Sequence, residues 1–225
     1  MEMFLTRDRL IELVCRQLES SFILSDDEAE CVYLVIDAAI QRCAMCFSKC
    51  RNKYYSKDGK AFFNPFHSGQ YTIFLYWLSR IMFLSHKDKH LSLCDRIYYL
   101  NRMLNGVDLF YEVDMPTYFM LDHPLGSVMG RAVYADGFSF SQQCTVGSNK
   151  GIYPVLGKNV TLFSGAKVLG NSTLGSNVIV SANTYILDLE VPDYSLVFGR
   201  PRDYVIRKID EEQFTDFKSF DLIHD

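Results

Sequence analysis

The sequence has no excess of positive charge, no apolar run of membrane length and no apolar leader. Its 23 basic and 27 acidic residues give a net charge of −4, which disfavours a nucleic-acid partner. The longest apolar stretch, Tyr71–Leu84, is shorter than the roughly 20 residues of a membrane span and contains Ser79 and Arg80. The first fifteen residues carry early acids and lack an apolar core, so no secretory signal is expected.

The seven cysteines are an odd number, which does not suit a disulfide framework. Most lie in helix-like apolar patterns, so we expect reduced thiols and a cytoplasmic protein. Residues 43–50 hold three cysteines at spacings that resemble a metal site, but in a helical pattern that supplies no four converging ligands. His86, His90 and Cys94 are spaced four apart beside charged residues typical of a solvated face. We therefore expect no metal.

The pattern of the chain changes near residue 107. Before it, apolar residues recur at helical spacing, and Ser25 with Glu28 resembles a capping box that opens a helix. Residues 53–65 form a polar connector, and Gly106 is well placed to end the last helix. The expected helices cover residues 10–18, 26–43, a segment from about 66, and 88–104.

After residue 107, apolar residues recur at a strict spacing of six. This period fits neither a helix nor a flat strand, but it fits a β-solenoid with three short sides and about 18 residues per coil. The repeated residue points inward, so stacked coils bury one column. A ten-residue interval from Val146 to Leu156 predicts an extra loop within Gly147–Pro154. The repeat comprises Val128, Tyr134, Phe140, Val146, Leu156, Leu162, Val168, Leu174, Val180 and Ile186.

These patterns predict an α+β chain. An N-terminal α-helical domain, residues 1–106, is followed by a left-handed parallel β-helix, residues 107–199, whose coils end beyond Asp188. A short C-terminal tail, residues 200–225, contains a polar, helix-compatible segment at 206–223.

Several segments resemble the serine acetyltransferases, a branch of the hexapeptide-repeat acyltransferases. Met120–Gly126, which contains Asp122 and His123, is similar to their catalytic Asp-His segment, and Gly165–Asn171 is similar to the coil beside their CoA arm. Phe66-His67 with Gln70, and Val113-Asp114, match shorter motifs. The resemblance covers roughly residues 66–205. It implies acetyl-CoA as co-substrate and a homotrimer, in which two trimers can pair through the helical domain.

The resemblance identifies His123 as the catalytic residue. A hydroxyl is a poor nucleophile at neutral pH, and a neutral imidazole suits the base that it needs. The resemblance puts His123 at a subunit boundary and gives Asp122 contact with the acceptor. Asp114 is the second acidic acceptor contact, at a spacing of nine residues from His123 that is shorter than in the family. The alternatives are a structural histidine and a turn aspartate.

Contacts with CoA follow from the resemblance and the repeat. Gly147 matches the position whose backbone N–H stabilises the oxyanion, although a corner with positive φ would also explain a glycine. Ser164 and Ala182 are 18 residues apart, so they stack on one edge and leave room for the pantetheine arm, or are small because coils pack tightly. Arg200 and Arg202, with Lys208, are predicted to meet the CoA phosphates.

The extra loop departs from the family. Where serine acetyltransferases have an Arg-His pair before a proline, this sequence has Ile152-Tyr153, and isoleucine cannot clamp a carboxylate. Lys150 offers a single positive charge, and Tyr153 can stack on a sugar. The sequence therefore favours O-acetylation of a sugar or surface polysaccharide, as in capsule biosynthesis. The alternatives are serine O-acetylation, N-acetylation of an amino sugar, and a trimeric binding module without catalysis.

Overall fold

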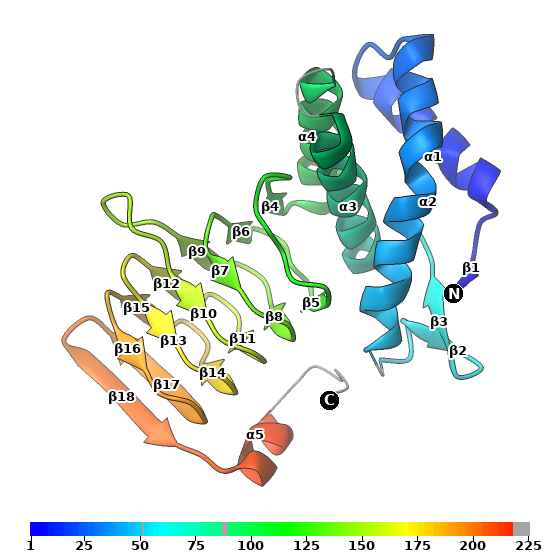
Figure 1. Cartoon of the computed structure of the whole chain (residues 1–225). Coiled ribbons are helices and arrows are strands. Elements are labelled where there is room, and N and C mark those ends of the chain that lie inside the picture. The colour runs from blue at the N-terminus through cyan, green and yellow to red at the C-terminus, as the bar shows by residue number, and fades with distance from the viewer. Residues whose placement is uncertain (51, 87–89, 218–225) are drawn as a thin grey trace. The chain divides into compact units, whose positions relative to one another are not determined.

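The computed structural model describes residues 1–50, 52–86 and 90–217 (Figure 1). The chain forms two compact units, Met1–Glu112 and Val113–Asp225. The first unit is mainly helical and the second is a parallel β-solenoid of about five turns, which confirms the predicted fold class. The predicted domain boundary at 106 lies just before the observed division, and a β-hairpin crosses the predicted boundary at 199.

The first unit contains four helices in its described residues, and their ends follow the sequence signals. Ser25 and Glu28 form the predicted capping box, because each side chain bonds the other residue's backbone N–H. Gly106 ends the last helix with φ of +65°, a conformation that glycine adopts without strain. The elements are β1 (Glu2–Met3), α1 (Arg7–Ser21), α2 (Asp26–Ser48), β2 (Ser56–Lys57), β3 (Lys60–Phe63), α3 (Ser68–His86), α4 (Leu91–Asn105) and β4 (Asp108–Leu109).

Helix α3 is the core of this unit. Residues 73–78 are each at most 4 % exposed, because α3 packs between α2 and α4. The apolar stretch Tyr71–Leu84 therefore lies in a helix that is buried over its first half, whereas Leu84 at its end is 51 % exposed. Helix α2 is long and apolar enough to cross a membrane, but 44 % of its most apolar stretch is buried within the structure, and core helices meet the same criterion.

The predicted connector at residues 53–65 contains a β-hairpin. Strands β2 and β3 pair antiparallel around Asp58 and Gly59, whose φ angles are +51° and +75°. An Asp-Gly pair with two positive φ angles is the usual sequence of such a turn, so the polar connector contains a hairpin that its composition did not predict. β1 pairs parallel with β3 and extends this small sheet.

The second unit stacks short parallel strands into three sheets. One sheet has the order β18-β17-β14-β11-β8-β5, another has β16-β13-β10-β7, and the third contains β15-β12-β9-β6. The strands are β5 (Phe119–Leu121), β6 (Val128–Met129), β7 (Val133–Tyr134), β8 (Phe138–Phe140), β9 (Thr145–Gly147), β10 (Val155–Leu156), β11 (Thr161–Leu162), β12 (Lys167–Leu169), β13 (Thr173–Leu174), β14 (Val178–Val180), β15 (Tyr185–Leu187), β16 (Glu190–Val191), β17 (Ser195–Arg200) and β18 (Asp203–Lys208).

The inward column follows the hexapeptide repeat except at its first position. The six repeat residues from Leu156 to Ile186 are at most 1 % exposed. Val128, however, is 41 % exposed, and the next residue, Met129, is buried at 1 % and pairs with Val146. The prediction for Val128 was wrong because the interval from Met129 to Tyr134 is one residue shorter than the repeat.

The extra loop is present where the interrupted repeat predicted it. Asn149 and Ile152 exchange two backbone hydrogen bonds of 3.0 Å, which close a tight turn. The two residues at its tip, Lys150 and Gly151, have φ of +52° and +77°. The loop therefore projects from the solenoid as a small hairpin.

The solenoid does not end at Asp188 as expected. Strand β16 continues one sheet, β17 continues another, and β17 turns back into β18. Helix α5 (Glu211–Phe217) then packs over the last coil, since Ile209 and Phe214 are buried with Ile179 and Leu196. The expected helix at 206–223 thus begins later, and residues 218–223 lie outside the described part.

Candidate active site

The predicted catalytic histidine lies in the turn between β5 and β6. His123 has φ of +48°, in the left-handed region that few residues other than glycine adopt. Its carbonyl accepts a 2.7 Å hydrogen bond from Leu125 N. Nine other described non-glycine residues share a positive φ, so this conformation fits His123 to its turn and does not by itself mark a functional site.

The buried hydroxyl of Ser127 fixes this turn to the next coil. Ser127 is 1 % exposed, donates to Ser141 O at 2.8 Å and accepts from Cys144 N at 3.1 Å. The two partners flank the turn between β8 and β9. No local pattern predicted this role of Ser127, because its partners are 14 and 17 residues away in the sequence.

The functional groups of Asp122 and His123 lie close together and open to solvent. His123 Nε2 is 3.7 Å from Asp122 Oδ1, and the side chains are 86 % and 48 % exposed. This distance is too long for a hydrogen bond but allows an ion pair once the ring is protonated. The imidazole is therefore accessible to an acceptor and has a carboxylate beside it.

The turns that lead from the sheet containing β8 to the sheet containing β9 stack along one edge of the solenoid. Gln143 N donates to Leu125 O, Gly165 N to Gln142 O, and Asn183 N to Ser164 O, each at 2.9 Å. Ser164 and Ala182 therefore stack, as their spacing predicted. The turn that carries His123 begins the same edge.

Gln142 and Gln143 also lie on this edge, although the repeat did not predict them. Gln142 precedes Ser164 by 22 residues, because the extra loop adds four to the usual 18, and a search at 18 does not connect them. When the four residues of the extra loop are subtracted from this separation, Gln142 and Ser164 are again 18 residues apart. Neighbouring coils are about 4.8 Å apart, so the four turns span roughly 14 Å. An edge of this length suits an extended arm.

Gly147 is the last residue of β9. It therefore lies at the C-terminal ends of the strands in this sheet, whereas the stacked turns lie at their N-terminal ends. Its φ is outside the left-handed region, so the interpretation as a positive-φ corner was wrong. A Cβ added there would meet Leu169 Cδ2 at 3.7 Å, an ordinary contact. Neither backbone conformation nor packing within the chain requires a glycine at this position.

The predicted acceptor contacts do not gather around His123 within one chain. Lys150 and the 44 % exposed Tyr153 belong to the loop after β9, whereas His123 precedes β6. These two segments lie at opposite ends of one sheet. Asp114 is exposed in the segment that leads into β5.

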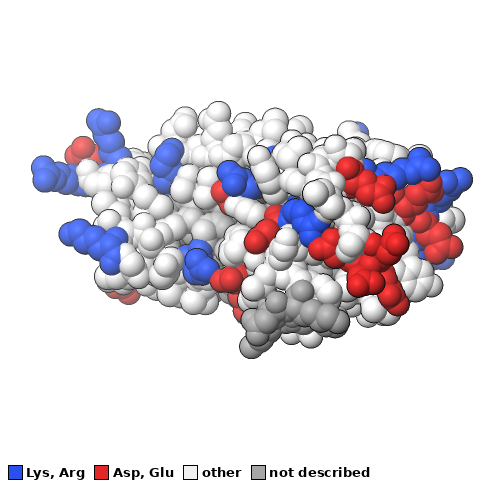
Figure 2. All heavy atoms as spheres, turned by 90° about the horizontal axis from the view of Figure 1, so that it is seen from above, with Lys and Arg blue, Asp and Glu red and all other residues white. Residues whose placement is uncertain are grey.

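The two predicted phosphate-binding arginines lie at the tip of the β17–β18 hairpin. Arg200 is in register with Asp203, Arg202 has φ of +82°, and both arginines are exposed. Figure 2 shows basic side chains at the end of the view where this hairpin lies. Lys208 is at the opposite end of β18, so the structure separates it from the arginines.

The cysteines that resembled a metal site are core residues. Cys43, Cys46 and Cys50 are at most 6 % exposed, and burial raises the pKa of the Cys43 thiol well above its ordinary value. Within the described ranges, no three His, Cys, Asp or Glu side chains form a group able to hold a metal ion. The side chain of His86 lies outside those ranges.

Related sequences are serine acetyltransferases. The enzyme of Staphylococcus xylosus is 32 % identical over 130 residues, which are 56 % of this chain and 60 % of that protein. The enzyme of Staphylococcus aureus is 31 % identical over 118 residues, 45 % of this chain and 50 % of that protein. The chain thus spans about half to three-fifths of these relatives. No protein-family model matches the sequence.

Solved serine acetyltransferases share the fold. The structure from Neisseria gonorrhoeae has a TM-score of 0.67 at 21 % identity and covers 86 % of this chain and 76 % of that one. A serine acetyltransferase in complex with CoA has a TM-score of 0.64 at 22 % identity, over 79 % and 74 % of the two chains. The chain therefore has serine acetyltransferase homologues along part of its length and the fold of their solved structures, helices followed by a hexapeptide-repeat β-solenoid.

Proposed function

We propose that this protein is an acetyl-CoA-dependent serine O-acetyltransferase with His123 as general base. The observation that carries the proposal is the position of His123, exposed beside Asp122 at the head of the edge on which Ser164 and Ala182 stack. The imidazole takes the acceptor's hydroxyl proton as its oxygen attacks the thioester carbonyl. The C–S bond then breaks, and the imidazolium returns the proton to the CoA thiolate.

Acetyl-CoA comes to the proposal from the relatives and is supported by the edge itself. The stacked turns offer small side chains at Ser164 and Ala182, beside which an extended pantetheine arm can lie. Gly147 is free of any packing constraint within the chain, which suits a backbone N–H that a thioester must approach closely. Arg200 and Arg202 supply positive charge for the phosphates at the last coil.

The choice of serine replaces the sugar acceptor that the sequence analysis favoured. The relatives are serine acetyltransferases, one solved structure of the same fold is a soybean enzyme complexed with serine, and nothing among them supports a polysaccharide. Without the family's arginine, the serine carboxylate has Lys150 as its cationic contact, and Tyr153 lies beside it in the same loop. We expect this substitution to weaken serine binding rather than to change the reaction.

A homotrimer belongs to the same proposal. His123 is 86 % exposed in the single chain, and the loop that holds Lys150 lies at the far end of the sheet. A neighbouring copy would bring its own loop to His123 and cover the ring from solvent. The active site is then complete only between subunits.

The proposed location of the enzyme is the cytoplasm.

The test follows thiol release from acetyl-CoA with L-serine or a capsule-type polysaccharide as acceptor. The informative variant is His123→Asn, because asparagine tolerates the left-handed backbone that alanine would strain. Loss of a general base lowers kcat by about 10²- to 10⁴-fold. Asp58→Asn is the matched control, since it introduces asparagine at another exposed left-handed position.

The outcomes separate the base from the acceptor. Release with serine that is lost in His123→Asn and kept in Asp58→Asn supports the proposal. Thiol release with the polysaccharide alone would overturn serine as the acceptor, but it would leave His123 as the proposed general base. Full activity in His123→Asn overturns the mechanism. In Lys150→Met, a raised KM for serine at an unchanged kcat is expected if Lys150 holds the carboxylate.

A further inference from the structure

The base of the extra loop is tied to a turn two coils further along the solenoid. Asn149 Nδ2 donates to Asp188 Oδ2 at 3.3 Å, although the two residues are 39 positions apart in the sequence. Asn149 lies in the loop after β9, and Asp188 follows β15. Strand β12 separates β9 from β15 in their sheet (Figure 1), so this side-chain contact reaches past the coil between them.

The carboxylate of Asp188 is fixed to that intervening coil. Its Oδ1 accepts a 2.7 Å hydrogen bond from Asn171 N, in the turn between β12 and β13. The backbone N–H of Asp188 donates to Leu169 O at 3.3 Å. One carboxylate oxygen therefore holds Asp188 in place, and the other is offered to the loop.

Gly170 makes room for this bridge. Its φ is +70°, and a Cβ built there would lie 2.1 Å from Asp188 Oδ1 and 2.9 Å from Asn149 Cβ. Its N–H donates to Gly147 O at 3.1 Å, which holds it against the coil that carries the loop. A side chain at position 170 would therefore push the loop and the carboxylate apart.

A second aspartate shows which part of this arrangement is particular to the loop. Asp193 Oδ1 accepts from Ser176 N at 2.6 Å, and these two residues are also 17 positions apart. Carboxylate contacts of this kind thus tie successive coils elsewhere in the solenoid. The contact with Asn149 is what distinguishes Asp188, because it joins the carboxylate to the inserted loop.

The contact is made at the root of the loop, where it controls the rest. Asn149 and Ile152 exchange two backbone hydrogen bonds, so the small hairpin moves as a unit with Asn149. Ile152 and Tyr153 are 50 % and 44 % exposed, so the hairpin extends into solvent. The anchor at Asn149 therefore sets the direction in which Lys150 and Tyr153 are presented.

We propose that Asp188 is a positioning residue, which holds the loop where the Lys150 ammonium group meets the carboxylate of the acceptor. This inference rests on the proposed function, in which Lys150 binds serine. Without the anchor the loop samples other positions, and the apparent affinity falls with the fraction of molecules whose loop is in place. The complex that does form is the same, so KM for serine rises and kcat stays unchanged.

The test is Asp188→Asn, because asparagine tolerates the φ of +50° and has one acceptor oxygen for the two donors. The shorter bond to Asn171 N keeps that oxygen, so the new amide nitrogen faces Asn149 Nδ2 and the loop is released. Loss of one such hydrogen bond should speed hydrogen exchange of residues 148–153 about three- to tenfold and raise KM for serine by a similar factor. Mass spectrometry of the loop peptide and thiol release measure the two effects.

The reciprocal variant Asn149→Asp/Asp188→Asn should reverse both effects. The carboxylate at position 149 then accepts from the amide at position 188, and the pair carries one negative charge as before. A general loss of stability at Asp188 would not be rescued in this way. Asp193→Asn is the matched control and should leave the exchange of the loop and KM for serine unchanged, because Asp193 bonds a turn without an inserted loop.

The outcomes separate the anchor from the proposed function. Equal exchange of the loop in wild type and Asp188→Asn would overturn the anchor. A faster exchange with an unchanged KM for serine would overturn the positioning role. If the wild type does not acetylate serine, the proposed function fails and the role toward serine fails with it, while the exchange data still decide whether Asp188 holds the loop.

A second variant covers the case in which Asp188→Asn fails to fold. Asn149→Ala removes the donor on the loop and leaves the bond between Asp188 and Asn171 in place. It should raise KM for serine and speed exchange of the loop as Asp188→Asn does. Wild-type values of both quantities in this variant would overturn the proposal.

Discussion

Gly157→Ala is predicted to force two coils of the solenoid apart. Gly157 follows β10, and its N–H donates to Leu174 O at 2.8 Å. A Cβ at this position would lie 2.6 Å from Gly175 C, 2.7 Å from Gly175 O and 2.9 Å from Ser176 N. All three contacts are with backbone of the next coil, so no side chain can rotate to relieve them.

The magnitude follows from this overlap. Ordinary contacts of a Cβ begin near 3.4 Å, so the coils must separate by close to an ångström or the chain must bend. Overpacking a well-packed interior costs about 1–3 kcal/mol, and the loss of the Gly157–Leu174 hydrogen bond adds about 1 kcal/mol. At about 2–4 °C per kcal/mol, the melting temperature falls by roughly 5–15 °C.

Thermal unfolding followed by circular dichroism measures the effect, with Gly147→Ala as the matched control. Gly147 has an ordinary φ, and its added Cβ would come no nearer than 3.7 Å to Leu169 Cδ2. That change is expected to be neutral or to stabilise by about 0.4–1 kcal/mol through the unfolded chain. Equal melting temperatures for the two variants would refute the reasoning that coil-to-coil approach requires Gly157.

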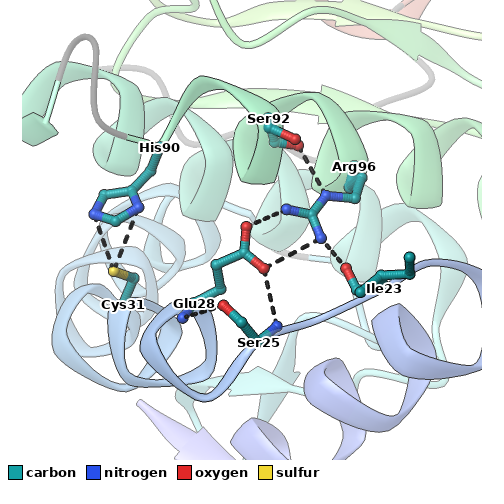
Figure 3. A network of polar contacts seen from close by, with 7 residues as sticks. All are labelled: Ile23, Ser25, Glu28, Cys31, His90, Ser92 and Arg96. Carbon is teal, nitrogen blue, oxygen red and sulfur yellow. Dashed lines mark hydrogen bonds and ion pairs between the residues drawn. The ribbon is translucent and has the colours of Figure 1, made fainter.

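Three further predictions concern the active site and the helical unit. Gly147→Ala should fold normally yet lose about 10²-fold or more in kcat, measured as thiol release, because the methyl group stands where the thioester approaches; unchanged turnover would exclude Gly147 from the oxyanion site. Ser127→Ala leaves a buried N–H and carbonyl without their partner, so the melting temperature should fall by about 2–10 °C, with a matching rise in hydrogen exchange at Cys144 N. Glu28→Gln should destabilise the protein at pH 7, and the difference should shrink as the pH falls below 4.5: the side-chain hydrogen bond from Arg96 (Figure 3) lowers the pKa of Glu28, so the wild type loses this stability as the pH falls through the folded pKa. Parallel curves of stability against pH for the two proteins would contradict it.

Some elements were predictable from the sequence and others were not, for reasons that lie in particular residues. The capping box at Ser25 and the stop at Gly106 were predictable because their partners lie within a few residues. The β2–β3 hairpin carries an equally local Asp-Gly signal, but its polar strands resemble a connector. Val128 was misplaced because a repeat cannot report that one turn of the first coil is a residue short.

The sequence by itself determined the class of fold, and it carries the prediction that His123 is the catalytic base. A period of six sets which side chains point inward, and this depends only on neighbours along the chain. The segment around His123 carries its resemblance in consecutive residues.

The tertiary structure decided which distant residues meet. Stacking of coils aligned Gln142 with Ser164 across an inserted loop and tied the His123 turn to Ser141 through Ser127. Helix packing placed Cys31 against His90 (Figure 3). Such contacts depend on the lengths of turns and on the packing of whole elements, which no local pattern encodes.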